Sequence, residues 1–176
     1  KSINELGRVL KKDDLIILES TCPVGTTEKI AKWLNKIRPD LRLPVFGATG
    51  QNADVNIAYC PERVLPGDII KELTENDRII GGITSRCAIR AKQIYELFVN
   101  GTCSITDSRT AEFCKLAENS FRDVNIAFAN ELSIVCDKLD IDVWRLIEFA
   151  NRHPRVNIMK PGSGVGGHCV AVDPWF

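Results

Sequence analysis

Short apolar runs alternate with segments of helical spacing along the first part of the chain. The runs predict strands at residues 15–21, 56–61, 78–82 and 103–106. The spacing between them predicts a helix from Thr26 or Thr27, either of which could be the N-cap, to about Ile37, and another from Ser85 to Val99. Strands that alternate with helices are typical of an α/β fold with a parallel sheet, in which residues 15–21 form a buried strand.

The pattern changes after Ser108. Residues 109–139 contain neither Pro nor Gly and repeat apolar positions, which predicts one helix of about 30 residues, far longer than the average. Such a helix usually connects two domains or forms a subunit interface. Asp142 is expected to cap a second helix over residues 143–151. We therefore predict two domains, 1–107 and 108–176.

Composition excludes several classes of protein. Lys plus Arg equals Asp plus Glu at 23 each, so nothing favours a nucleic-acid or membrane partner. No apolar run approaches the ~18 residues that span a bilayer. The first residues do not resemble a signal peptide, and no GxGxxG follows a strand. We expect the chain to be the middle of a larger polypeptide.

The cysteines argue against cross-links and metals. There are seven of them, an odd number at wide spacings with no CxxC pair, so neither a disulfide framework nor a zinc site is expected. The simplest interpretation is a reduced, cytosolic protein whose cysteines mostly serve packing.

One cysteine stands apart because glycines surround it. Gly162, Gly164, Gly166 and Gly167 precede Cys169, and Asp173 follows it. Glycine lets the backbone approach a ligand closely, so this loop could present a nucleophilic thiol beside N–H donors for an oxyanion. The alternative is a buried structural cysteine beside a turn.

A second group of candidates lies on the long helix. Lys115 and Asn119 are four residues apart and share one face. Together they could donate hydrogen bonds to an oxyanion, and a partly desolvated lysine can act as a general acid or base. The alternative for Lys115 is a solvated helix residue.

Polar residues also follow two predicted strands. Glu62 and Arg63 come after residues 56–61, and Thr21 ends the first strand. Ligands bind at the carboxyl ends of strands in open α/β sheets, so Glu62 could position water or remove a proton, and the Thr21 hydroxyl could meet a cofactor. The alternatives are a surface Glu62–Arg63 pair and a helix cap.

Basic residues precede the glycine loop. Arg152, His153 and Arg155 could bind a phosphate-bearing substrate, because the guanidinium matches phosphate geometry. The alternative for His153 is a satisfied loop histidine.

Four of these segments occur together in one known family. They are ESTCPVGT at 19–26, YCPER at 59–63, TAEFCKLAENSFRDVN at 110–125 and GVGGHC at 164–169, followed by Asp173. In this order they resemble the UDP-glucose/GDP-mannose dehydrogenase family along the whole chain. The resemblance implies the later part of a Rossmann-like NAD-binding domain, then a long helix and a helical central dimerisation domain.

The resemblance also implies a reaction and its residues. Family members oxidise a sugar C6 hydroxyl to a carboxylate with two NAD, through a thiohemiacetal and a thioester on the residue that matches Cys169. Lys115 and Asn119 match the oxyanion and proton-handling pair, and Asp173 the acid near the cysteine. Glu62 matches the glutamate that handles water, and together with Thr21 it lies near NAD.

The remaining implications concern substrate and assembly. A UDP-N-acetylhexosamine is expected, UDP-N-acetylmannosamine before UDP-N-acetylglucosamine, and a homodimer through the 109–139 helix. Pro66 stands where related enzymes often carry a second acid. A different class of function, an inactive piece that acts only as a dimerisation module, stays open. The residues expected to contact substrate are Arg63, Lys115, Asn119, Arg152, His153, Arg155 and Gly166.

Overall fold

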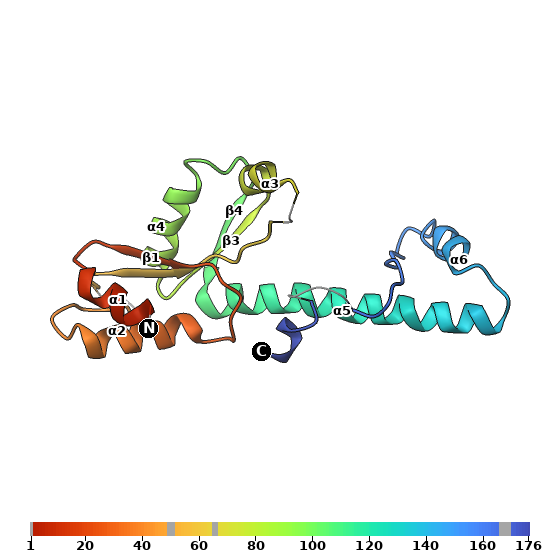
Figure 1. Ribbon diagram of the computed structural model, residues 1–176. Helices are drawn as coiled ribbons and strands as arrows, with labels where there is room; N and C mark the ends of the chain where they lie inside the picture. The colour runs from red at the N-terminus through yellow and green to blue at the C-terminus, as the bar shows by residue number, and fades with distance from the viewer. Residues whose placement is uncertain (1, 49–51, 65–66, 166–169) are drawn as a thin grey trace. The chain divides into compact units, whose positions relative to one another are not determined.

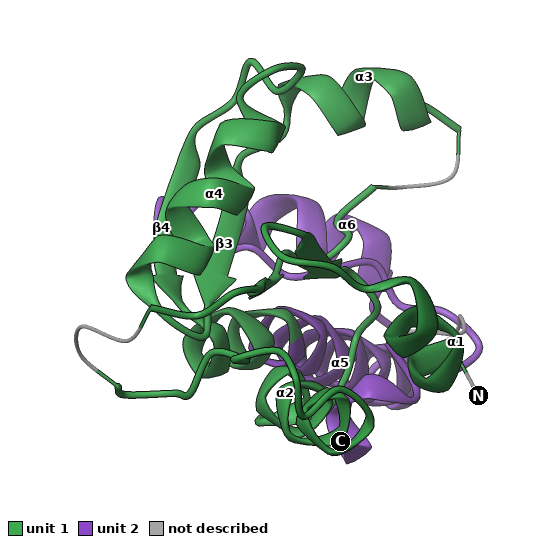
Figure 2. Cartoon of the chain, turned by 90° about the vertical axis from the view of Figure 1, so that its left-hand side faces the viewer, with its two compact units in different colours: residues 1–115 green, residues 116–176 purple. Residues whose placement is uncertain are grey.

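The computed structural model describes residues 2–48, 52–64, 67–165 and 170–176. They form two compact units, residues 1–115 and 116–176 (Figure 2). Helix α5 (Ser108–Lys138) begins in the first unit and continues in the second. In the described ranges, no helix has both the length and the hydropathy that crossing a membrane requires.

The first unit contains a four-stranded sheet in the order β1-β2-β3-β4 (Figure 1). The strands are β1 (Leu15–Leu18), β2 (Asn56–Tyr59), β3 (Arg78–Gly82) and β4 (Cys103–Asp107). The α/β fold and the presence of all four strands are confirmed, but β1 and β2 end at Leu18 and Tyr59 rather than at residues 21 and 61. A wholly parallel sheet was wrong, because β3 runs antiparallel to β2 while the other two pairs are parallel.

Each face of the sheet has its own apolar core. Ile16 and Leu18 pack on the side of α2 (Thr26–Ile37), whereas Leu15 and Ile17 pack on the side of α4 (Ser85–Tyr95). This alternation is the period of two that a strand between two helical layers requires. The strand was expected to be buried, but all four of its residues are only half-buried.

Two helices of the first unit were not predicted. α1 (Ser2–Val9) packs against α2, and α3 (Ile69–Glu75) lies in the connection from β2 to β3. α3 buries none of its residues, but Ile69, Ile70 and Leu73 stand three and four residues apart, so the sequence carried a short helical signal that was missed. The helix expected to reach Val99 ends at Tyr95.

Gly81 allows α5 to start close to the sheet. A Cβ at this position would lie 2.5 Å from the Asp107 carbonyl oxygen and 2.6 Å from the Ala111 Cβ. The first turn of α5 therefore packs directly on β3.

In the second unit, α5 is followed by α6 (Val143–Ala150) and a short 3₁₀ turn, η1 (Asp173–Trp175). The predicted bounds of α5 are right to within one residue, and the Asp142 cap is confirmed. The Asp142 carboxylate accepts the N–H groups of Trp144 and Arg145 at 2.9 and 3.4 Å.

Candidate functional site

The segments that leave β1 and β2 stay side by side beyond the strands. The Cys60 N–H donates to the Leu18 carbonyl at 2.9 Å, and the Glu62 N–H donates to the Glu19 carbonyl at 3.2 Å. Thr21, which is half-buried, and Glu62 therefore lie on adjoining segments at the carboxyl ends of two parallel strands. Open α/β sheets bind ligands at such an edge.

Glu62 is held in place by its own backbone and by a buried cation. Its Oε1 accepts the N–H groups of Arg63 and Val64, each at 2.7 Å. The Nη1 of Arg78 lies 3.8 Å from the same oxygen, with the Arg78 side chain only 1% exposed and that of Glu62 46% exposed. Arg78 reaches this edge because β3 is antiparallel, so the first residue of β3 meets the end of β2.

The rest of the Arg78 guanidinium has one further polar contact and one aromatic contact. Its Nη2 donates to the Leu73 carbonyl at 3.0 Å, and its carbon lies 5.8 Å from the Tyr95 ring centre. Sequence reasoning missed Arg78. The only signal was a charged residue at the start of an otherwise apolar strand.

Lys115 joins Thr21, Glu62 and Arg78 at the carboxyl ends of β1 and β2, and these four residues are called the strand-end cluster below. Its Nζ donates to the Glu62 carbonyl at 2.7 Å, and the residue is half-buried. The alternative of a freely solvated lysine was wrong, since the first turns of α5 direct this side chain to the end of β2. Arg63, also half-buried, donates from Nη1 to the Asp77 carbonyl at 3.3 Å.

The turn after Thr21 is held by a carboxylate from α5. Glu112 accepts the N–H groups of Gly25 and Thr27 at 2.5 and 2.8 Å and the Thr27 hydroxyl at 2.6 Å. The predicted Thr26 or Thr27 cap of α2 was wrong: the N-cap is Gly25, at φ 89°. Glu112 could not be found from local sequence, because it lies 85 residues beyond Thr27.

Burial makes the nearby thiols weak acids. Burial, and then the neighbouring Glu112 carboxylate, raises the pKa of Cys22 to about 11. Burial likewise raises the pKa of Cys60 to about 11. Five of the six described cysteines are buried, and all six are free, which agrees with a packing role. Cys169 lies outside the described residues, as do Gly166 and Pro66.

In the second unit, Asn119 and Asp173 meet. The Asn119 Nδ2 donates to the Asp173 Oδ2 at 2.5 Å, and both side chains are buried. Asp173 begins η1, so this contact ties the segment after the glycine loop to α5. The structure thus joins two candidate residues that lie 54 positions apart in the sequence.

The basic candidates Arg152, His153 and Arg155 are exposed on one loop. The Arg152 guanidinium pairs with Glu148 at 3.2 Å, and the His153 Nδ1 accepts the Arg155 N–H at 3.3 Å. Asn151 closes the loop, because its side chain donates to the Ile158 carbonyl at 3.0 Å and accepts the Ile158 N–H at 2.7 Å.

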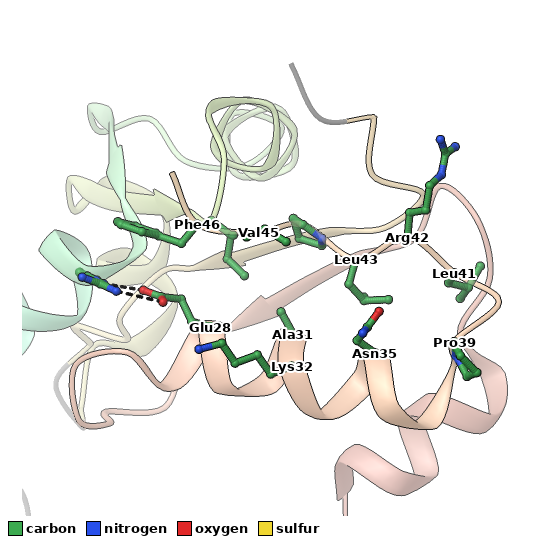
Figure 3. Close-up of a pocket in the computed structure, with 13 residues that line it drawn as sticks. Glu28, Ala31, Lys32, Asn35, Pro39, Leu41, Arg42, Leu43, Val45 and Phe46 are labelled. Carbon is green, nitrogen blue, oxygen red and sulfur yellow. Dashed lines mark hydrogen bonds and ion pairs between the residues drawn. The ribbon is translucent and has the colours of Figure 1, made fainter. Parts of the chain in front are cut away.

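A pocket of about 460 Å³ lies between α2 and the segment that follows it (Figure 3). None of the candidate residues named above lines it. A bidentate ion pair closes one end, with the Arg109 Nε and Nη2 at 2.5 and 3.1 Å from the Glu28 carboxylate.

The first unit is an α/β domain of the kind that binds ligands at its strand ends. Residues 1–99 match the family model "UDP-glucose/GDP-mannose dehydrogenase family, NAD binding domain", and residues 109–176 match the model of the central domain of that family. The chain therefore belongs to the UDP-glucose/GDP-mannose dehydrogenase family.

Curated relatives are closely similar. A UDP-N-acetyl-D-mannosamine dehydrogenase of Yersinia pestis is 66% identical over 97% of this chain and 40% of its own length. An NDP-N-acetyl-D-galactosaminuronic acid dehydrogenase of Ralstonia nicotianae is 62% identical over the same shares. The chain thus spans about 40% of the length of these relatives.

A solved structure has the same fold. The UDP-D-ManNAc dehydrogenase from Pyrococcus horikoshii superposes with a TM-score of 0.90 at 44% identity, over 99% of this chain and 40% of that one.

Proposed function

We propose that the full-length protein containing this chain oxidises the C6 hydroxyl of UDP-N-acetylmannosamine to the carboxylate, with NAD as the oxidant. The observation that carries the proposal is the meeting of Glu62 and Lys115 at the strand ends. It unites two candidate residues from segments 53 positions apart at the edge where α/β sheets bind ligands. The names of the similar proteins support this class of substrate.

Thr21 and Glu62 fit part of a nicotinamide cofactor site. A hydroxyl and a carboxylate on adjoining segments beyond parallel strands provide polar groups where a nucleotide cofactor approaches the sheet. The glycine fingerprint that binds a pyrophosphate is not in this sequence, so these residues would hold only part of NAD. When bound, NAD supplies the acceptor for hydride.

Cys169 is proposed as the nucleophile. Loss of hydride from C6 and of the hydroxyl proton first converts the alcohol to the aldehyde. The Cys169 thiolate adds to the aldehyde carbon to give a thiohemiacetal, and loss of hydride from that carbon and of the hydroxyl proton leaves a thioester. Water then attacks the thioester, which releases the carboxylate and returns the thiol. Covalent capture keeps the aldehyde oriented between the two oxidations. Two NAD are reduced for each sugar.

Lys115 and Asn119 are proposed to serve the oxygen of the reacting carbon. An ammonium and a side-chain amide both donate hydrogen bonds, so they stabilise the oxyanion that forms when the thiolate or water adds. Asp173 fixes the Asn119 amide through their 2.5 Å hydrogen bond. Glu62, held by two backbone N–H groups, is proposed to position the water that attacks the thioester.

Contacts to the UDP-sugar are proposed for the exposed basic loop. The Arg152 and Arg155 guanidinium groups offer positive charge to the diphosphate and His153 a ring N–H, on a loop that Asn151 holds closed. Arg63 and Gly166 complete the proposed substrate contacts, together with Lys115 and Asn119.

A homodimer through the 109–139 helix is part of the proposal. Apolar residues of α5 in the second unit lie exposed at helical spacing, among them Phe121, Val124 and Phe128 at 61%, 65% and 50%. Exposed apolar rows of this kind mark interaction surfaces. The same row favours a second candidate function, in which this piece alone acts as a dimerisation module without catalysis.

Counting NADH tests the proposed reaction. The full-length protein is incubated with NAD and, separately, UDP-N-acetylmannosamine, UDP-N-acetylglucosamine and UDP-glucose. We expect two NADH for each UDP-N-acetylmannosamine consumed by the wild type. The Cys169→Ser variant should give at most one NADH for each sugar and release no carboxylate, because a hydroxyl in place of the thiol is a far weaker nucleophile towards the aldehyde. Cys114→Ser, at a half-buried cysteine, is the matched control and should retain activity.

The outcomes separate the alternatives. Turnover of UDP-N-acetylglucosamine instead would change the sugar but not the reaction. Full acid production by Cys169→Ser would contradict the nucleophile. No NADH from any of the three sugars would leave the dimerisation module as the function to pursue.

A further inference from the structure

Glu112 is a fully buried carboxylate to which the proposed chemistry gives no role. It lies in the second turn of α5 and points at the N-terminus of α2, where it accepts the three hydrogen bonds from Gly25 and Thr27. The Sγ of Cys22 lies 3.9 Å from its Oε1. Burying a carboxylate is costly unless donors satisfy it. The protein therefore gains stability by keeping the donors Gly25 and Thr27 within hydrogen-bond distance of Glu112.

The contacts of Glu112 define the turn that follows Thr21. The N-cap of α2 is Gly25, in the left-handed region and without a side-chain oxygen of its own, so the carboxylate of Glu112 supplies the acceptor that a cap normally provides. A negative charge at a helix N-terminus is also favourable to the helix dipole. The turn from Cys22 to Thr27 is thereby tied to α5.

The same face of α5 is tied to the other strand end. Glu112 and Lys115 are three residues apart, so their side chains leave the helix on one side. Glu112 holds the turn after β1, and Lys115 holds the segment after β2 through the Glu62 carbonyl. One turn of α5 therefore joins the two segments that carry Thr21 and Glu62.

We propose that Glu112 is a positioning residue that sets the place of Thr21 relative to Lys115 and Glu62. This inference rests on the proposed function, because Thr21, Glu62 and Lys115 take their roles from it. Glu112 touches neither substrate nor cofactor; it acts through the turn that it caps. Misplacing reacting groups by about 1 Å can cost on the order of 100-fold in rate, so loss of this anchor should appear in turnover.

The test uses Glu112→Gln in the full-length protein. Glutamine keeps the size of the side chain, but one of its two terminal atoms is an NH₂ group that cannot accept a hydrogen bond from Gly25 or Thr27. Glu75→Gln is the matched control, because it makes the same change at an exposed residue of the same unit whose ion pair with Lys71 is long, at 3.9 Å.

Two measurements are made on each variant. Amide hydrogen exchange of residues 22–30 should rise in Glu112→Gln and stay unchanged in Glu75→Gln. kcat with UDP-N-acetylmannosamine should fall about 10- to 100-fold in Glu112→Gln, while KM for the sugar changes by less than about threefold. Such a split is not expected from a purely structural cap, which would lower the amount of folded enzyme and leave kcat per folded molecule intact.

A double variant tests whether Glu112 sets the place of Thr21 relative to Lys115. If it does, then Glu112→Gln should cost less in the Lys115→Met background than in the wild type, because one of the two groups whose relative position it sets is already gone. Equal costs in both backgrounds, like unchanged exchange or unchanged kcat, would overturn the positioning role.

Thr27 provides a milder test in case Glu112→Gln does not fold. Thr27→Val removes only the hydroxyl donor, and Thr27→Ser keeps it. We expect Thr27→Val to lower kcat and Thr27→Ser to restore most of it, whereas equal rates would count against the proposal.

The outcomes distinguish the positioning role from the proposed function. A wild-type protein inactive on all three UDP-sugars would overturn both. An active wild type whose Glu112 and Thr27 variants are equally active would overturn the positioning role alone.

Discussion

At the scale of single residues, sequence analysis found the candidate site residues whose side chains are reactive or polar and which lie in a recognisable segment. Lys115, Glu62, Asn119 and Asp173 all stand in recognisable segments, and the structure brings Lys115 to Glu62 and Asn119 to Asp173. Glu112 stands in the same segment as Lys115, but its role was not predictable, because its hydrogen-bond donors lie 85 and 87 positions away in the chain.

The buried thiols make the stability of the protein sensitive to alkaline pH. The pKa of Cys22 and of Cys60 rises from 9.0 to about 11 on folding. Between these values the unfolded chain loses protons that the folded chain keeps. The protonated thiols therefore contribute fully to the free energy of unfolding below pH 9. This contribution is lost as the pH rises towards 11, at about 1.4 kcal/mol for each thiol and pH unit.

Thermal unfolding under reducing conditions at pH 8 and at pH 10.5 measures this effect. The wild type should unfold at a lower temperature at pH 10.5, and the fall should be smaller for Cys22→Ala, which has no thiol to titrate at this position. An equal fall in both proteins would show that Cys22 does not contribute.

At the scale of helices and strands, the sequence was most informative where an element has a strong apolar pattern. The bounds of α5 and the Asp142 cap of α6 followed from pattern and local chemistry. α3 was missed although Ile69, Ile70 and Leu73 stand at helical spacing, because seven residues hold only one short repeat of the pattern. The direction of β3 could not be predicted either, since a short strand with an apolar centre looks the same in a parallel and an antiparallel pair.

The cap of α6 gives a prediction at this scale. Asp142→Ala removes the acceptor for the Trp144 and Arg145 N–H groups and should lower the free energy of unfolding by about 1 kcal/mol. Asp142→Asn retains an acceptor oxygen and should be close to the wild type. Urea unfolding compares the three proteins, and equal losses in both variants would indicate that the charge rather than the cap matters.

At the scale of the whole molecule, the chain carries parts of two family domains, and its sequence alone placed it in the family. What the sequence could not provide is the set of long-range contacts that assemble the strand-end cluster. Assembly with a second copy through α5 is the part of the proposed function that is tested at this scale.

The dimer is tested by placing a charge on the exposed row of α5. Phe121→Glu removes a large apolar side chain that is 61% exposed in the single chain, and burial of such a side chain contributes about 1.5–3 kcal/mol. We expect light scattering after gel filtration to show a dimer for the wild type and mostly monomer for this variant. Lys138→Glu, at an exposed polar position of the same helix, is the control and should remain dimeric.

The antiparallel pairing of β2 and β3 has a consequence for protein engineering. Two antiparallel neighbours need no crossover helix, so the connection between them has no sheet face to cover. The start of α3 reflects this, with Ile69 and Ile70 57% and 80% exposed. A fluorescent label or a short affinity tag inserted near Gly67 should therefore leave strand register and core untouched, which makes this stretch a convenient handle for single-molecule work.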